Sequence, residues 1–109
     1  MINTFSRNNE VTAPGSTIGI VGGGQLGRMM ALAAANLGYK IHIYCQELTN
    51  AAAQVVNERT IAEYQDTDAL KRFAESVSVV TFEFENIPHT TVQTLANYVE
   101  TCPSWEALH

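Results

Sequence analysis

The expected fold is decided by one stretch of sequence, TIGIVGGGQLG at residues 17–27. Its first five residues form a short apolar, β-branched run, three glycines follow, and helical spacing begins at Gln25. A strand that passes through a glycine turn into a helix is typical of the opening unit of an α/β domain. The turn satisfies the Gly-x-Gly-x-x-Gly pattern at Gly22, Gly24 and Gly27, which alone is weak evidence for any particular ligand.

The segment after the glycines has a continuous apolar face. Its members are Leu26, Met29, Met30, Ala33 and Leu37. These residues follow the period of an α-helix, and Gly38 follows them as a helix-ending residue. We therefore expect the stripe, methionines included, to pack in the core rather than to hold a cofactor.

The same alternation continues to the end of the chain. Further strands are expected at residues 41–45, weakly at 60–62, and at 77–82. Helices are expected behind Asp66, a suitable N-cap, and behind Pro88, which suits a helix start. Short apolar strands alternating with helices predict right-handed crossovers and an α/β fold with an open, parallel, doubly wound sheet.

The sequence suggests three parts. Residues 1–16 are mostly polar and lack any period, so we expect a flexible leader. Residues 17–103 form the predicted domain. Ser104 resembles the N-cap of a helix that occupies residues 104–109, and a helix of barely one turn suggests that the chain is a piece of a longer protein.

Composition excludes several classes of protein. The 109 residues carry a net charge of −5 without any Lys/Arg cluster, which argues against nucleic acid as a partner. There is neither a signal peptide nor a run of eighteen apolar residues, so we expect a soluble, cytoplasmic protein with no membrane partner. Cys45 and Cys102 suit buried thiols better than a disulfide. The three histidines show no metal-ligand spacing, and we expect neither a metal site nor a complete catalytic constellation.

Candidate binding residues follow two of the predicted strands. Gly24, Gln25 and Leu26 open the first helix, where backbone N–H groups can meet a polar or anionic ligand. The acidic segment after residue 82 supplies Glu83, Glu85 and Asn86. Ligands of open α/β sheets bind beyond the carboxyl ends of the strands, which would bring both segments together.

The role of the acidic segment remains open from local physics alone. Glu83 and Glu85 alternate along extended backbone and would point to opposite faces, so one of them can enter a cleft. The alternative is an exposed acidic turn that stabilises the start of the helix behind Pro88.

Two other functional classes fit part of the sequence. One is a stand-alone module that binds NAD or another nucleotide, but the acidic residue expected after the second strand is replaced by Cys45 and Gln46, with Glu47 as a substitute only if the strand end shifts. The other is a domain kept for assembly, which sequence cannot locate.

Two motifs carry a resemblance to a known family. The runs GGGQLGRMM at residues 22–30 and FEFENIP at residues 82–88 resemble 5-(carboxyamino)imidazole ribonucleotide synthases, with further similarity at 52–55, 69–74 and 103–108. The resemblance covers about residues 17–109. It implies a Rossmann-like pre-ATP-grasp domain at the N-terminus of a ligase that joins bicarbonate to 5-aminoimidazole ribonucleotide with ATP in purine biosynthesis.

The resemblance also implies roles for individual residues. Gln25, Leu26 and either Glu83 or Glu85 would receive the ribonucleotide. ATP and Mg²⁺ would bind mainly outside these 109 residues, so the fragment alone is expected to be inactive. A homodimer is the usual state of similar enzymes and remains an open alternative.

Overall fold

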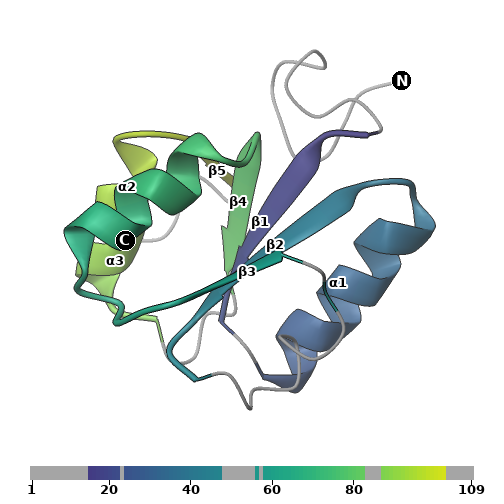
Figure 1. The fold of residues 1–109 in the computed structure, drawn as a ribbon, viewed down its shortest axis with the longest axis horizontal. Coiled ribbons are helices and arrows are strands. Elements are labelled where there is room, and N and C mark those ends of the chain that lie inside the picture. Colours follow the sequence, from purple (N-terminus) through teal and green to yellow (C-terminus); the bar gives the residue numbers. More distant parts are fainter. Residues whose placement is uncertain (1–14, 23, 48–55, 57, 83–86, 103–109) are drawn as a thin grey trace.

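The computed structural model describes residues 15–22, 24–47, 56, 58–82 and 87–102, without the side chain of Leu26. In chain order the elements are β1 (Thr17–Val21), α1 (Gln25–Asn36), β2 (Lys40–Cys45), β3 (Glu58–Ile61), α2 (Thr67–Glu75), β4 (Val79–Phe82), α3 (His89–Ala96) and β5 (Glu100–Cys102). Figure 1 shows the strands forming one twisted sheet with helices on both sides.

The sheet confirms the predicted fold class. Its strands are all parallel and lie in the order β3-β2-β1-β4-β5. The first strand, β1, is therefore central, with β2 and β3 on one side of it and β4 and β5 on the other. Helix α1 packs on one face of the sheet, and α2 and α3 pack on the other (Figure 1). This arrangement is an open doubly wound sheet.

Several strand boundaries differ from the sequence prediction. β2 begins at Lys40 rather than at residue 41, β3 spans Glu58–Ile61 rather than residues 60–62, and β4 begins at Val79 rather than at Val77. β5 was not predicted at all, because Glu100, Thr101 and Cys102 are too few and too polar to show an apolar pattern. Pairing with β4 makes them a strand.

The predicted core face of α1 was wrong for three of its five residues. Met29 and Leu37 are each 65% exposed and Ala33 is exposed, whereas Ala31 and Ala34 are buried against the sheet. Met30 packs against the same buried cluster, as predicted, and the side chain of Leu26 lies outside the described part. Small side chains let the helix lie close to the strands and leave Met29 and Leu37 outside the contact.

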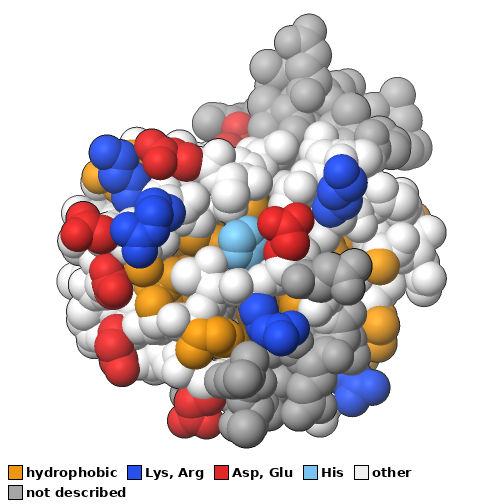
Figure 2. All heavy atoms as spheres, in the orientation of Figure 1, with side chains coloured by type: hydrophobic (Ala, Val, Ile, Leu, Met, Phe, Trp, Pro, Cys, Tyr) orange, Lys and Arg blue, Asp and Glu red, His pale blue; other side chains and the backbone are white. Residues whose placement is uncertain are grey.

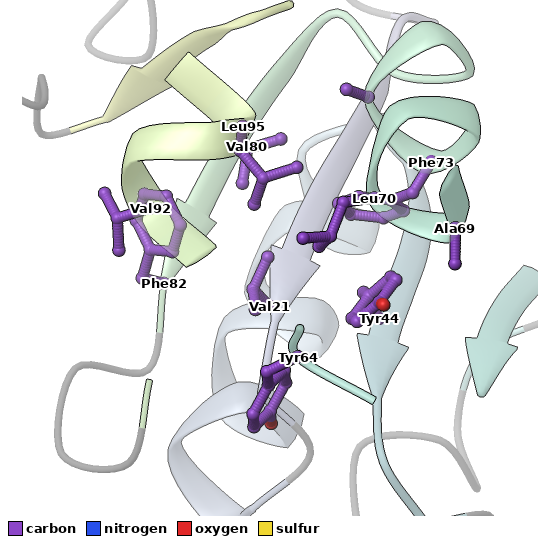
Figure 3. Close-up of a cluster of buried hydrophobic side chains, with 11 residues drawn as sticks. Val21, Tyr44, Tyr64, Ala69, Leu70, Phe73, Val80, Phe82, Val92 and Leu95 are labelled. Atoms are coloured by element: carbon purple, nitrogen blue, oxygen red, sulfur yellow. The ribbon is translucent and has the colours of Figure 1, made fainter. Parts of the chain in front are cut away.

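The predictions for α2 are confirmed. The Asp66 side chain accepts a hydrogen bond from the Ala69 N–H at 3.0 Å and so caps the helix. Leu70 and Phe73 are 1% exposed and join residues of β1, β2, β4 and α3 in the cluster drawn in Figure 3. Gly19 leaves room for this packing, since a Cβ there would lie 2.6 Å from Cζ of Phe73.

A buried imidazole links β2, β3 and α2. In His42, Nε2 lies 2.7 Å from Oγ1 of Thr60 and Nδ1 lies 3.1 Å from Oγ of Ser76. Ser76 donates its own hydroxyl proton to the Phe73 carbonyl at 2.7 Å, so Nδ1 is the donor to Ser76. Burial lowers the pKa of His42 against a smaller opposing effect of Glu58, so the ring is neutral at neutral pH and Nε2 accepts from Thr60.

Candidate functional site

The candidate site lies at the carboxyl ends of the two central strands. Val21, the last residue of β1, is paired with Phe82, the last residue of β4. The glycine turn after β1 and the acidic segment after β4 therefore leave the sheet from adjacent positions. Gly22 takes a φ of +113°, which glycine adopts without strain, and its N–H donates to the Tyr44 carbonyl at 2.9 Å.

The start of α1 carries no side-chain cap of its own. Gly24 is its N-cap, and within the described residues neither a side-chain cap nor an acidic residue occupies the first turn. Because N–H groups of a first turn have no intrahelical acceptor, such a helix start favours a polar or anionic ligand. Gln25 is exposed at this end, and Gly27 is buried.

The structure places only part of the predicted site. Gly24 and Gln25 lie together at the start of α1, and the backbone of Leu26 lies in its first turn. Glu83, Glu85 and Asn86 lie outside the described residues, so the proximity of a glutamate to Gln25 stays a prediction. The paired strand ends are what supports it.

The end of β2 differs from a dinucleotide site. Cys45 stands at the last position of the strand with no exposed surface, and its thiol donates to the Glu47 carbonyl at 3.3 Å. The next residue, Gln46, donates to a carboxylate oxygen of Glu63 at 2.5 Å. The acidic group at this corner is therefore supplied from beyond β3 and is already hydrogen-bonded.

Glu63 is a further polar residue at this corner, and the sequence alone does not indicate it. Its backbone carbonyl also accepts a hydrogen bond from the Tyr44 hydroxyl at 2.5 Å, so it joins the ends of β2 and β3. Burial, followed by the nearby Asp66, raises the pKa of Tyr44 to about 12, which keeps this hydroxyl a neutral donor. Nothing in the local sequence marks Glu63, because its position results from the pairing of Cys45 with Ile61.

Other kinds of site receive no support from the described residues. Across these parts of the chain, no group of three His, Cys, Asp or Glu side chains is placed to hold a metal ion. Figure 2 shows acidic and basic side chains interspersed on one face of the molecule, without a continuous basic patch there. The described helices include none that is long and apolar enough to cross a membrane.

The cysteine prediction holds only for one of the two thiols. Cys45 is fully buried, whereas Cys102 is half-buried at the end of β5. Neither forms a disulfide. Burial, with a smaller effect of Glu100, raises the pKa of the Cys102 thiol, so it stays protonated at neutral pH.

Two curated proteins illustrate what the sequence is similar to. The "Bifunctional purine synthesis protein purC/E" of Dictyostelium discoideum is 53% identical over 103 residues, which cover 94% of this chain and 10% of that protein. The "N5-carboxyaminoimidazole ribonucleotide synthase" of Brucella melitensis is 47% identical over 95 residues, which cover 87% and 26%. The chain thus spans about a quarter or less of the length of these relatives.

Solved structures agree with these relatives. An N5-carboxyaminoimidazole ribonucleotide synthetase in complex with ADP matches with a TM-score of 0.82 and 44% identity, over 89% of this chain and 26% of that one. A synthase from Aspergillus clavatus, solved with ADP and 5-aminoimidazole ribonucleotide, matches with a TM-score of 0.73 and 27% identity over 86% and 25%.

One family model covers nearly the whole chain. The family described as "Ribonucleotide synthetase preATP-grasp domain" matches residues 15–109, which include the glycine turn, the acidic segment and every described strand and helix. The chain therefore belongs to the ribonucleotide synthetase preATP-grasp domain family.

Proposed function

We propose that this chain is the N-terminal substrate-binding domain of an ATP-dependent ligase that carboxylates 5-aminoimidazole ribonucleotide in purine biosynthesis. The names of the relatives and the complex of the Aspergillus clavatus enzyme with that ribonucleotide support the proposal. Because the matched region is about a quarter of those enzymes, the complete reaction belongs to a longer protein.

The observation that carries the proposal is the pairing of two strand ends, Val21 of β1 with Phe82 of β4. In the sequence, the glycine turn and the start of α1 follow the first strand end, and Glu83 follows the second. The backbone N–H groups and the Gln25 amide suit the anionic and polar groups of a ribonucleotide. A carboxylate of Glu83 or Glu85 would accept hydrogen bonds from its amino or hydroxyl groups.

The division of labour follows from what the domain offers. ATP would supply the phosphoryl group that activates bicarbonate, and Mg²⁺ would accompany it. As the resemblance to the ligase family implies, we assign both mainly to the remainder of the ligase. The domain itself binds the ribonucleotide and orients its amino group, a positioning role that lowers the entropic barrier of a bimolecular step.

The test is isothermal titration calorimetry, which measures the affinity of the 109-residue chain for 5-aminoimidazole ribonucleotide. Gln25→Ala and one of Glu83→Ala and Glu85→Ala should each weaken binding about tenfold, or about 1.4 kcal/mol. Gln93→Ala is the matched control, because this exposed glutamine lies on α3, on the opposite face from α1.

The outcomes separate the alternatives. If Glu85→Ala weakens binding and Glu83→Ala does not, Glu85 is the residue that faces the substrate. If none of the three variants differs from Gln93→Ala, the site is misplaced. Saturable binding of NAD in place of the ribonucleotide would favour the nucleotide-module alternative.

A further inference from the structure

Tyr64 lies on the short connection between β3 and α2, and it reaches the same end of the sheet as the glycine turn. Its ring stacks on that of Tyr44, with 6.1 Å between the ring centroids and an interplanar angle of 27°. Tyr44 is paired with Val21, and its carbonyl accepts a hydrogen bond from the Gly22 N–H at 2.9 Å. The ring of Tyr64 is therefore separated by one side chain from the residue at which the glycine turn begins.

The Tyr64 hydroxyl is directed toward the edge of the sheet at which the candidate site lies. Figure 3 shows the ring beyond the carboxyl end of β1, with its oxygen pointing away from the strand. Val21 is the last residue of that strand, and α1 begins at Gln25 after the glycines. Ligands of doubly wound sheets bind at this edge, so the phenol group is placed where a ligand would be.

Two hydrogen bonds fix the backbone that carries this ring. The Tyr44 hydroxyl donates to the Glu63 carbonyl at 2.5 Å, and the Thr91 hydroxyl donates to the Tyr64 carbonyl at 2.7 Å. The two donors belong to β2 and α3, so the connection is held from two separate elements. A side chain that is positioned in this way loses little conformational entropy when a ligand binds.

The packing of Tyr64 does not depend on its hydroxyl group. The cluster around the ring consists mainly of aliphatic and phenylalanine side chains. A phenylalanine could make the same stack on Tyr44, and neither that stack nor the bond from Thr91 uses the phenol oxygen. A tyrosine hydroxyl both donates and accepts hydrogen bonds, so at this edge it suits the hydroxyl, amino and phosphate groups of a ribonucleotide.

We infer that Tyr64 is a further binding residue of the ribonucleotide site, where its hydroxyl forms a hydrogen bond with the ligand. The inference rests on the proposed function, because it requires the ribonucleotide to bind beside the start of α1. The sequence alone does not indicate this residue. Tyr64 follows β3, and only the stack on Tyr44 brings it to the end of β1.

The test removes single hydroxyl groups by replacing tyrosine with phenylalanine in the 109-residue chain. Isothermal titration calorimetry with 5-aminoimidazole ribonucleotide should show that Tyr64→Phe weakens binding about tenfold, or about 1.4 kcal/mol. Tyr98→Phe is the matched control for affinity, because Tyr98 is 48% exposed and lies between α3 and the start of β5, at the opposite edge of the sheet. It should bind the ribonucleotide as the unsubstituted chain does.

Urea denaturation without ligand separates a binding role from a structural one. Tyr44→Phe removes the donor to the Glu63 carbonyl and should lower the denaturation midpoint, as expected for a hydroxyl that serves folding. Tyr64→Phe keeps the ring stack and should lower the midpoint less. Circular dichroism should show that all three variants are folded.

The outcomes distinguish this inference from the proposed function. If Gln25→Ala weakens binding but Tyr64→Phe binds as tightly as Tyr98→Phe, the site is correct and the role given to Tyr64 is wrong. A midpoint that falls as far in Tyr64→Phe as in Tyr44→Phe, with unchanged affinity, would assign the hydroxyl to folding alone. If the unsubstituted chain does not bind the ribonucleotide, the proposed function fails, and this inference fails with it.

Discussion

The two faces of the sheet are built from alternate residues of the same strands, yet they are packed in different ways. On the α2 and α3 face, large side chains interlock, with Tyr44, Phe73 and Phe82 at most 1% exposed (Figure 3). On the α1 face, alanines contact the strands and a groove stays open beside them. The difference shows that burial follows side-chain size and helix position as well as hydrophobicity.

The two helices differ in how well their sequences indicate orientation. α2 has charged residues opposite a narrow apolar stripe, so only one face of it can be buried. α1 is apolar around most of its circumference, from Met29 and Met30 to Leu32 and the alanines. Such a helix could bury an apolar face in several orientations. Close contact with the sheet selects the orientation in which the smallest side chains face the strands.

The largest expected effect is the loss of Phe73. Phe73→Ala removes a ring that contacts His42 and Tyr44 and leaves a cavity under α2, which should cost about 3–5 kcal/mol in the free energy of unfolding. Leu37→Ala on the α1 flank should stay within about 0.5 kcal/mol when the residue is as exposed as it is here. Urea denaturation of both variants measures the difference.

A large loss of stability for Leu37→Ala would contradict the described difference between the two faces, because it would show that Leu37 is buried in solution. Equal small losses for both variants would instead contradict the packing described for α2.

A smaller effect is expected where β1 meets α2. Gly19→Ala would place a Cβ 2.6 Å from Cζ of Phe73 and 3.1 Å from a methyl group of Val77, so overpacking should cost about 1–3 kcal/mol. Phe73→Leu removes the Cζ atom that the new Cβ would meet. The double variant Gly19→Ala/Phe73→Leu should therefore lose less stability than the sum of the two single losses, by about 0.5–3 kcal/mol. Strict additivity of the two losses would refute the contact.

The smallest effect concerns pH. Burial lowers the pKa of His42 below its ordinary value of 6.5 in the folded state, so the unfolded chain binds this proton first as the pH falls. Its contribution to stability is therefore fully present above about pH 6.5 and declines from there toward the lower, folded-state pKa. Glu58 opposes the shift, while Thr60 and Ser76 hold the neutral ring by hydrogen bonds.

Denaturation midpoints measured from pH 8 to pH 5 should show this decline. His42→Asn should be less stable at pH 8, because the ring contact with Phe73 is lost, and should show a flatter dependence on pH. If the stability of His42→Asn depends on pH in the same way as that of the unsubstituted chain, other titratable groups cause the decline.

Much of the fold could be predicted because its signals are local. The β-branched run before Gly22, the glycines after it and the Asp66 cap each specify a structure within a few residues. β5 and the orientation of α1 could not be predicted, since the first depends on its partner β4 and the second on the shape of the sheet surface. Both are tertiary effects.

The candidate site was likewise predicted only where its signals are local in sequence. Gly24 and Gln25 were found from sequence because a glycine turn ahead of a helix has a recognisable pattern. The hydrogen bond between Gln46 and Glu63 was not, because it joins residues that only the β2 and β3 pairing brings together.

The outer strands of the described sheet also bear on how the protein behaves at high concentration. β3 presents the exposed charges of Glu58 and Arg59, and β5 offers only three residues. Another chain that added a strand to β3 would have to remove both charged groups from water, and β5 is too short for an extended pairing. Both borders of the described sheet are thereby protected against edge-to-edge aggregation.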